Sequence, residues 1–231
     1  MRPNTRYGRS RRGGQGFKGD GYRRYGKRLL DLVMAVTGLL LLSPLLTAVA
    51  ALVRRDVGSP ILFRHVRLGR DGEPFTLLKF RTMHDPRDAE GRVIPGDSPQ
   101  AYQDARMGLR QTRLGKLLRD TGIDELPELL NVISGRMSIV GPRPLLVEYR
   151  DRYSVRQMRR HEVRPGITGW AQIHGRQAVS YSERFELDVW YVDHISFRLD
   201  MKVLAFTLRE LIVQRGTSEP GYATGTEFMG A

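Results

Sequence analysis

The sequence predicts a mixed α/β protein that is mostly helical, with a small β-hairpin or sheet and a membrane-associated N-terminal helix-break-helix. Three observations support this fold class. An uncharged apolar stretch runs over 32–53, a strand–turn–strand pattern follows over 61–80, and apolar residues recur at helical spacing in later segments. We expect four regions: an Arg/Gly-rich disordered arm (1–26), the helix-break-helix (27–55), a globular domain (56–216) with interfacial amphipathic helices, and a C-terminal tail (217–231).

The positive charge of the chain is concentrated at its N-terminus. The formal net charge is +13, and residues 1–28 contain ten Lys or Arg against one acid, Asp20. The remaining 203 residues therefore carry only +4. A basic nucleic-acid-binding protein remains an alternative, but it would rest mainly on the arm, because the domain is only mildly basic. Arg/Gly arms with aromatic residues can bind RNA. We favour anionic lipid as the partner of this arm, because an apolar segment follows it.

The residue types limit the possible metal chemistry. Cysteine is absent, so the chain contains neither disulfides nor cysteine-ligated zinc. The five histidines show no H-x-x-x-H spacing, which argues against a histidine zinc site. A hard cation held by carboxylates and phosphate remains compatible with the sequence.

The apolar stretch over 32–53 is long enough to cross a bilayer but contains a break. As a straight helix it would reach about 33 Å, enough for a hydrocarbon core of about 30 Å. Ser43-Pro44 interrupts it, because proline removes a helix hydrogen bond. The two pieces, 32–43 and 45–53, are each too short to cross.

Basic residues lie on both sides of this stretch, at Lys27-Arg28 and Arg54-Arg55. Such residues favour the cytoplasmic side of a membrane, so both flanks favour the same side. A re-entrant helix-break-helix satisfies both. Two alternatives remain: a Pro-kinked spanning helix, and a signal peptide cleaved after the A-x-A sequence at 48–50.

A short acidic sequence lies at the start of a predicted helix. Asp124 and Glu125 precede Pro127, which suits a first helical turn. The helix is predicted from four apolar residues at i, i+3, i+4 and i+7, namely Leu126, Leu129, Leu130 and Ile133, and is expected to stop at Gly135. A helix N-terminus tolerates anions. One carboxylate can therefore attack or bind a metal while the other moves a proton, although acids also favour first turns without any function.

Two sequences supply cations for a phosphate site. The predicted hairpin, 61–68 and 74–80, leads to Lys79 and Arg81, which alternate along one strand face. Further along, Gly141-Pro142-Arg143-Pro144 holds an arginine in stiff extended backbone, as bidentate phosphate contacts require. We expect Gly141 to let backbone approach a ligand closely. A solvated strand face and a plain Pro-rich turn are the structural alternatives.

The remaining segments are assigned more briefly. A polar loop is expected over 84–99, a helix over 102–119 that ends at Thr121-Gly122, a basic helix over 155–161, and a site-lining strand and loop over 164–176 that contains Trp170 and Gln172. Helices are predicted over 185–192, where Asp188 positions a basic residue or is simply paired, and over 199–214, before Gly216.

Taken in order, these motifs resemble the small monotopic phosphoglycosyl transferases of the bacterial sugar transferase family. The resemblance covers roughly residues 27–229. It rests on Lys27-Arg28-x-x-Asp31, Ser43-Pro44, Lys79-Phe80-Arg81-Thr82-Met83, Asp124-Glu125-Leu126-Pro127, Gly141-Pro142-Arg143-Pro144, residues 164–172 and Glu186-Leu187-Asp188. The arm lies outside the family pattern, and the loop at 85–100 is longer than in the most compact members.

The resemblance implies transfer of a sugar-1-phosphate from a UDP-sugar to undecaprenyl phosphate, with release of UMP and use of Mg²⁺. It implies a cytosolic catalytic domain at the inner membrane, in contact with membrane phospholipids and without a nucleic-acid partner. By similarity, Asp124 is the nucleophile and metal ligand, and Glu125 is an acid/base partner or positions the metal. Substrate contacts are expected from Lys79, Arg81, Pro142, Arg143, Gln172 and Asp188. A non-catalytic adaptor of the same fold is a further alternative. The sugar, the pathway and the oligomeric state, a homodimer included, stay open.

Overall fold

The computed structural model of the protein describes residues 21–94, 103–105, 107–174 and 180–213. The predicted arm up to residue 20 and the tail over 217–231 lie outside these residues. The helices are η1 (Tyr22–Gly26), α1 (Lys27–Asp56), η2 (Arg70–Gly72), α3 (Arg113–Thr121), η3 (Ile123–Glu125), α4 (Glu128–Ile133), η4 (Val147–Arg152), α5 (Val155–Met158), η5 (Arg159–Glu162), α6 (Trp170–Ile173), α7 (Tyr181–His194) and α8 (Phe197–Val213). The strands are β1 (Leu62–Leu68), β2 (Pro74–Phe80), β3 (Ser138–Val140) and β4 (Gly166–Thr168).

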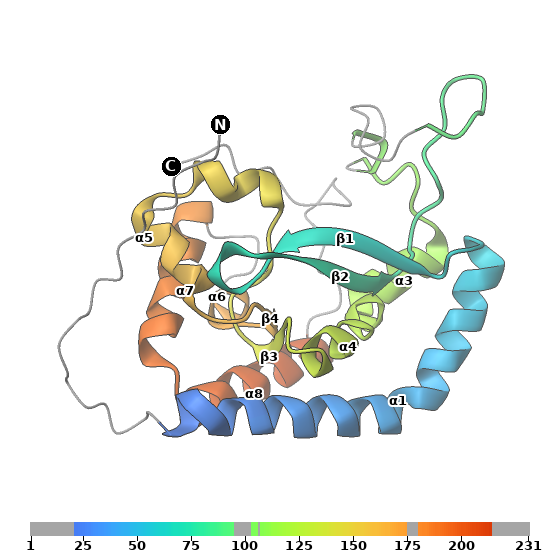
Figure 1. The fold of residues 1–231 in the computed structure, drawn as a ribbon. Helices are drawn as coiled ribbons and strands as arrows, with labels where there is room; N and C mark the ends of the chain where they lie inside the picture. Colours follow the sequence, from blue (N-terminus) through green and yellow to red (C-terminus); the bar gives the residue numbers. More distant parts are fainter. Residues whose placement is uncertain (1–20, 95–102, 106, 175–179, 214–231) are drawn as a thin grey trace.

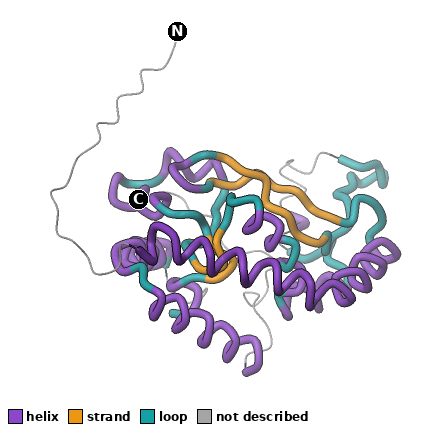
Figure 2. The backbone as a smooth tube through the Cα atoms, turned by 60° about the horizontal axis from the view of Figure 1, so that its bottom comes forward, coloured by secondary structure: helices purple, strands orange, loops and turns teal. Residues whose placement is uncertain are grey.

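The long helix α1 forms one side of the molecule, and the hairpin of β1 and β2 lies opposite it (Figure 1). Helices α3 and α4 and the short strands β3 and β4 lie between them, with α8 beside α1. β1 and β2 pair antiparallel, from Leu62 opposite Phe80 to Leu68 opposite Pro74, whereas β3 and β4 pair in parallel. A view from the α1 side shows this helix crossing the molecule (Figure 2). The mostly helical fold with a small hairpin is confirmed.

Helix α1 is bent, and the bend has a local cause (Figure 1). Pro44 lies inside the helix and cannot donate to the carbonyl of Leu40, four residues earlier. The hydroxyl of Ser43 donates to that carbonyl instead, at 2.8 Å. The Ser-Pro pair therefore bends the helix, and the carbonyl of Leu40 still accepts a hydrogen bond. An unsatisfied carbonyl would be costly in lipid, where no water can bind it.

Much of α1 is apolar and exposed. Together with η1 it forms a helix over Tyr22–Asp56 that is long and apolar enough to cross a membrane, by length and composition. Only 11% of its most apolar window is buried, unlike a core helix of a soluble protein. Leu40 and Leu41, just before the bend, are 70% and 75% exposed. These values indicate membrane association.

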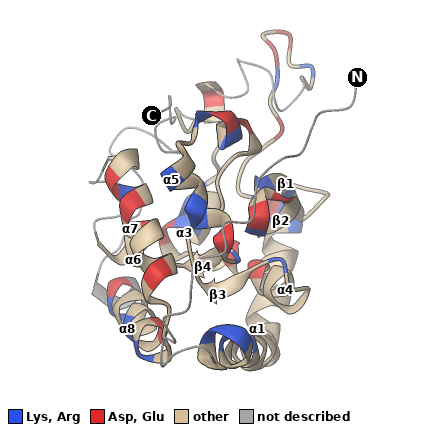
Figure 3. Ribbon diagram, turned by 60° about the vertical axis from the view of Figure 1, so that its left-hand side comes forward, with Lys and Arg blue, Asp and Glu red and all other residues tan. Residues whose placement is uncertain are grey.

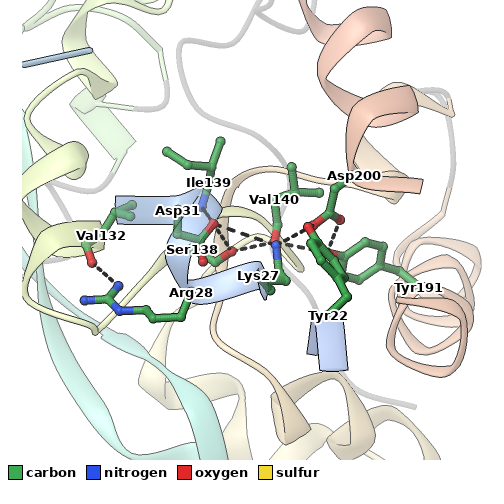
Figure 4. Close-up of polar contacts among 10 residues, drawn as sticks. All are labelled: Tyr22, Lys27, Arg28, Asp31, Val132, Ser138, Ile139, Val140, Tyr191 and Asp200. Atoms are coloured by element: carbon green, nitrogen blue, oxygen red, sulfur yellow. Dashed lines mark hydrogen bonds and ion pairs between the residues drawn. The ribbon is translucent and has the colours of Figure 1, made fainter. Parts of the chain in front are cut away.

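The N-terminal end of α1 is fastened to α8 by a buried carboxylate (Figure 4). One Asp200 oxygen accepts from the hydroxyl of Tyr22 at 2.5 Å and from Lys27 Nζ at 2.8 Å, and the other accepts from Tyr191 at 2.7 Å. Asp200 is fully buried. The helix η1 therefore lies within the segment, 1–26, that the sequence analysis assigned to the disordered arm, and that assignment is wrong for Tyr22–Gly26.

Two further residues of α1 bind the centre of the domain (Figure 4). Asp31 accepts from the backbone N–H of Ile139 at 3.0 Å and from the hydroxyl of Ser138 at 2.9 Å, which fixes β3 against α1. Arg28 donates to the carbonyls of Val132 and Ile133, the last residues of α4, at 2.6 and 2.9 Å. The Lys-Arg-x-x-Asp motif thus joins α1 to two elements more than 100 residues away in the sequence.

The C-terminal half of α1 packs on the same domain. Val49 and Val53 belong to a buried cluster with Phe80 of β2 and Leu118 of α3. Both ends of α1 therefore contact one folded body, while the leucines next to the bend stay exposed.

Asn131 fixes α4 against the hairpin. Its side-chain nitrogen donates to the carbonyl of Thr76 at 2.8 Å, and its side-chain oxygen accepts from the N–H of Leu78 at 3.0 Å. These are the free backbone groups of β2 on the edge away from β1. The amide of Asn131 thus takes the place of a third strand and sets α4 beside Lys79.

Several predicted boundaries shift. The helix predicted over 102–119 is interrupted: residues 103–105 are helical, residues 107–110 form a turn in which Gly108 has a φ of 73°, and α3 begins at Arg113 after its cap Thr112. The acidic pair lies in the 3₁₀ turn η3, just before α4, rather than in the first turn of α4 itself. Helix α7 is confirmed and longer than predicted, and α8 begins at Phe197. The basic helix predicted over 155–161 is the short α5 followed by η5.

We predict that Asp200→Asn destabilises the protein by about 3–5 kcal/mol, because it leaves the nearly buried Lys27 ammonium without its closest counter-charge. The measurement is unfolding of the full chain in detergent. The matched control is Asp193→Asn, whose half-exposed pair with Arg159 contributes only about 0–1 kcal/mol. Equal losses in the two variants would contradict the anchoring role of Asp200.

Candidate active site

The acidic pair is positioned by a sharp chain reversal. Helix α3 ends at Gly122, whose φ of 71° lies in the left-handed region that glycine adopts without strain. The chain turns through η3, and Asp124 and Glu125 follow within this turn. A substitution by a larger residue at Gly122 would strain the turn that presents both carboxylates.

The structure brings Glu125 together with two of the predicted cations. Lys79 Nζ lies 2.5 Å from Glu125 Oε1, and Arg143 Nη2 lies 2.6 Å from the same oxygen. Lys79 also lies 3.2 Å from Glu128, a carboxylate at the start of α4 that the sequence analysis did not single out. Its spacing of three residues from Glu125 was the available signal, because such residues are neighbours on a helix surface.

Asp124 differs from Glu125 in its contacts. It is 7% exposed, yet among the described residues no hydrogen bond or ion pair to its carboxylate is found. Its oxygens are therefore available to a ligand, whereas Glu125 is engaged by two cations. The geometry separates the two adjacent carboxylates into a free one and a bound one.

The electrostatics follow from this arrangement. Burial, together with the negative charge of Glu125, raises the pKa of the Asp124 carboxyl to about 6. Burial also acts to raise the pKa of Glu125, but Arg143 and Lys79 outweigh it and hold that pKa well below its usual range. For Glu128, burial and the neighbouring Glu125 raise the pKa to about 7. Glu125 therefore stays ionised at neutral pH, in contact with Lys79 and Arg143.

A small cavity lies beside Lys79 and Arg143, the two cations that bind Glu125; Asp124 and Glu125 are not among its lining residues. It has a volume of about 80 Å³, and the cations Lys79, Arg143 and Arg67 contribute to its lining together with Glu128. Arg67 is a further residue that the sequence analysis missed; burial, and then repulsion from Arg143, lower its pKa to about 10. Three cations around one small cavity suit an anionic group such as phosphate.

Arg119 adds positive charge on the α3 side. Its guanidinium donates to the hydroxyl of Thr82 at 2.9 Å, and its charge interacts with those of Asp124 and Glu125. It lies at the end of a helix whose start the sequence analysis misplaced, so its proximity to the acidic pair could not be inferred from spacing.

Asp188 supports Arg143 indirectly. The buried Asp188 carboxylate accepts two hydrogen bonds from Arg160, at 2.8 and 3.0 Å. Arg160 in turn donates to the backbone carbonyl of Arg143 at 2.7 Å. Asp188 is therefore paired with Arg160, and through Arg160 it helps to position Arg143, as one of the two interpretations from sequence expected. It lies outside the acidic cluster of Asp124, Glu125 and Glu128.

Other predicted site residues lie elsewhere. Arg81 follows β2 and donates to the carbonyl of Ser59 and to Asp85, so it does not join Lys79 at the acidic pair. The side-chain nitrogen of Gln172, in α6, donates to the carbonyl of Ile167, in β4, and so joins these two neighbouring elements. The segment that contains Gln172, expected over 164–176 as a strand and loop, forms β4 and then the short helix α6; residues 175 and 176 lie outside the described residues.

The role of Gly141 also differs from the prediction. A Cβ built on Gly141 would lie 2.5 Å from the carbonyl oxygen of Arg164, so the close approach is to protein backbone rather than to a ligand. The carbonyl of Pro142 accepts from Gly166 at 2.9 Å. Both residues therefore fix the loop that carries Arg143.

The donor set allows a shared Mg²⁺ rather than a closed protein site. In the described part of the chain, no cluster of three or more His, Cys, Asp or Glu side chains is arranged to hold a metal. Mg²⁺ commonly takes one or two carboxylates from the protein and the rest of its ligands from substrate phosphates and water. Asp124, whose oxygens contact no cation in the described part of the chain, fits that arrangement.

We predict that Asp124→Asn stabilises the protein above pH 6. The folded pKa is raised, so stability is lost as the pH rises from about 4 to about 6, by up to about 3 kcal/mol. The variant, which carries no charge there, escapes this loss. Unfolding curves at pH 4.5 and pH 7.5, with chelator present, measure the difference; Asp193→Asn serves as the control. No gain at pH 7.5 would contradict the buried, unneutralised state of Asp124.

Comparison with known proteins identifies the family. The family model described as bacterial sugar transferase matches residues 22–214. The chain is 48% identical over 205 residues to the uncharacterized sugar transferase EpsL of Bacillus subtilis (strain 168), covering 89% of this chain and 96% of that protein.

Two further relatives carry an activity in their names. The UDP-glucose:undecaprenyl-phosphate glucose-1-phosphate transferase of Escherichia coli (strain K12) is 39% identical over 198 residues, 81% of this chain but 40% of that enzyme. The UDP-N-acetylgalactosamine-undecaprenyl-phosphate N-acetylgalactosaminephosphotransferase of Aeromonas hydrophila is 37% identical over 196 residues, 82% of this chain and 44% of that enzyme. The chain thus spans less than half the length of these two. On the family match and the shared sequence, the chain belongs to the bacterial sugar transferase family.

Proposed function

We propose that the protein transfers a sugar-1-phosphate from a UDP-sugar to undecaprenyl phosphate, or a similar polyprenyl phosphate, and releases UMP. The observation that carries this proposal is the free, buried carboxylate of Asp124 beside a carboxylate held by two cations. The names of two relatives support the substrates. Those relatives act on different sugars at nearly the same identity to this chain, so identity alone does not select a sugar.

The reaction proceeds in two displacements. An Asp124 oxygen attacks the β-phosphorus of the UDP-sugar, and the bond from this phosphorus to the bridging oxygen breaks. UMP leaves with that oxygen, and the sugar phosphate stays on Asp124 as an acyl phosphate. A phosphate oxygen of the polyprenyl phosphate then attacks the same phosphorus, forms the lipid diphosphate and frees the carboxylate. Two steps suit one substrate from water and one from the bilayer.

The cations reduce the repulsion between an attacking carboxylate and a diphosphate. Arg143 and Lys79 border the small cavity and present positive charge where phosphate oxygens would lie. Preorganised partners of this kind are commonly worth about 3 kcal/mol each. Glu125 holds these two cations in place. When bound by Asp124 and the diphosphate, Mg²⁺ would further neutralise the phosphate charge.

The nucleophile assignment predicts that Asp124→Asn lowers the rate of UMP release by at least about a thousandfold. The control Asp193→Asn keeps the wild-type rate, since its carboxylate lies on the surface of α7. With UDP-sugar but no polyprenyl phosphate, mass spectrometry should find a sugar-phosphate adduct on the peptide that contains Asp124. An active Asp124→Asn variant, or an adduct on another residue, would refute the assignment.

The same proposal places α1 as a re-entrant helix at the cytoplasmic face of the inner membrane. It is supported by the Pro44 bend, the exposed leucines next to it, and the contacts of both α1 ends with one folded domain. A spanning helix would separate those ends by the bilayer.

Cysteine labelling tests this topology cleanly, because the chain contains no cysteine. Cysteines introduced at Tyr25 and Asp56, before and after the apolar stretch, should both react with an impermeant maleimide from the cytoplasmic side. A cysteine at Leu41 should be protected by lipid. Labelling of Tyr25→Cys and Asp56→Cys from opposite sides would establish a spanning helix instead.

A further inference from the structure

A second cavity lies at the beginning of α1, and its lining is dominated by arginine. We call it the basic hollow. It has a volume of about 680 Å³ and is lined by Arg23, Arg24, Tyr25, Arg28, Arg70 and Arg164, with Gly21 at its margin. Three separate parts of the chain supply the arginines: the start of α1, the hairpin turn and the segment before β4. In the ribbon view from that side, blue marks Lys and Arg positions at this end of α1 (Figure 3).

Two of these arginines are held in place by the fold. Arg28 donates to the last carbonyls of α4, and Arg164 Nε donates to the carbonyl of Gly135 at 2.8 Å. Arg28 therefore caps the C-terminal end of α4, where the helix dipole favours positive charge, and Arg164 binds the turn just beyond it. The terminal nitrogens of Arg164 make no hydrogen bond to another described residue. The hollow is thus built on fixed guanidinium groups as well as surface ones.

Little negative charge compensates these arginines. Among the described residues, the one carboxylate paired with them is that of Asp71, which lies 3.4 Å from Arg70 and is itself exposed. The pKa of Arg164 is lowered first by burial and then by Arg28 and Arg70, which shows that like charges crowd there. The preceding chain adds more basic residues and one acid, Asp20. An anion in the hollow would relieve this repulsion.

The hollow is separate from the candidate active site. Glu128 begins α4 and belongs to the acidic cluster, whereas Arg28 and Arg164 bind carbonyls at the opposite end of α4. The two cavities share no lining residue. An acceptor phosphate must reach Asp124, so the hollow is not placed to present one for reaction.

An apolar stripe leads away from the hollow along α1. Tyr25, Leu29, Val33, Val36 and Leu40 recur at i, i+4, i+8, i+11 and i+15, which places them on one helical face. They are 66%, 65%, 54%, 42% and 70% exposed, although all are large and apolar. The stripe extends for about 22 Å of helix, longer than half of a bilayer core of about 30 Å. Its first residue, Tyr25, lines the hollow.

We propose that the basic hollow binds the phosphate of an anionic membrane phospholipid whose acyl chains lie along this apolar stripe. Positive charge at one end and exposed apolar side chains along the rest match a lipid with an anionic headgroup. Arginine supplies several donors for phosphate oxygens. This inference depends on the proposed membrane seating of α1 but not on the transfer reaction. Such a lipid would fix the depth at which α1 enters the bilayer.

The test is native mass spectrometry of the full chain in neutral detergent, titrated with phosphatidylglycerol or with phosphatidylcholine. We expect preferential retention of phosphatidylglycerol. The triple variant Arg23→Gln/Arg24→Gln/Arg70→Gln should bind it about a hundredfold more weakly, at roughly fivefold per basic residue. The matching Lys variant should keep most of the binding. All three arginines are exposed, and none makes a hydrogen bond that supports the fold among the described residues.

The matched control is Arg54→Gln/Arg55→Gln/Arg113→Gln, which removes the same charge from exposed positions outside the hollow. It should retain wild-type binding of phosphatidylglycerol. Equal loss in both triple variants would reduce the effect to general charge attraction and overturn the proposal. So would equal retention of the two phospholipids, or displacement of phosphatidylglycerol by polyprenyl phosphate. No turnover is measured, so these outcomes are independent of the nucleophile test.

Discussion

The contact of Glu125 with Lys79 and Arg143 is the interaction on which the candidate site depends. Three carboxylates, those of Asp124, Glu125 and Glu128, lie close together in η3 and at the start of α4. Buried carboxylates need counter-charge. Lys79 and Arg143 both bind Glu125, and the neighbouring Asp124 has no hydrogen-bond or ion-pair partner among the described residues. Burial, and then the charge of Glu125, raise the pKa of Asp124. A site with these two cations on Asp124 would have a neutralised, poorly nucleophilic carboxylate. The distribution of two cations among adjacent acids therefore decides which one is available for chemistry.

Much of the fold serves to hold those two cations. Lys79 is near the end of β2, and Asn131 joins the edge of β2 to α4, so lysine and acidic pair share one rigid support. Arg143 follows β3, and its backbone is held by Arg160, which Asp188 orients from α7. The site is thus assembled from the hairpin, the α4 region and the β3 loop, and α7 supports it through the contact of Asp188 with Arg160.

The second constraint is the attachment of α1 at both ends. Lys27, Arg28 and Asp31 join its start to α8, α4 and β3, while Val49 and Val53 join its end to the hairpin and α3. The leucines beside the proline bend are left exposed. The elements that position the acidic pair also hold α1. If α1 enters the membrane as proposed, packing inside the domain sets the distance from the bilayer to Asp124.

The sequence by itself determined the features that depend on neighbours in the chain. The hairpin with its Asp-Gly turn, the bend at Ser43-Pro44, the reversal at Gly122 and the adjacency of Asp124 and Glu125 all follow from local backbone chemistry. The tertiary structure decided the partners. Lys79 and Arg81 were predicted to alternate along one strand face, yet Lys79 pairs with Glu125 whereas Arg81 binds Ser59 and Asp85. Asp188, expected to contact the substrate, pairs with Arg160. Arg119 approaches the acidic pair through the chain reversal at Gly122, and Glu128 was signalled only by its spacing from Glu125. Arg67 enters the site because β1 packs beside the loop that carries Arg143, and residue spacing carries no information about such a contact.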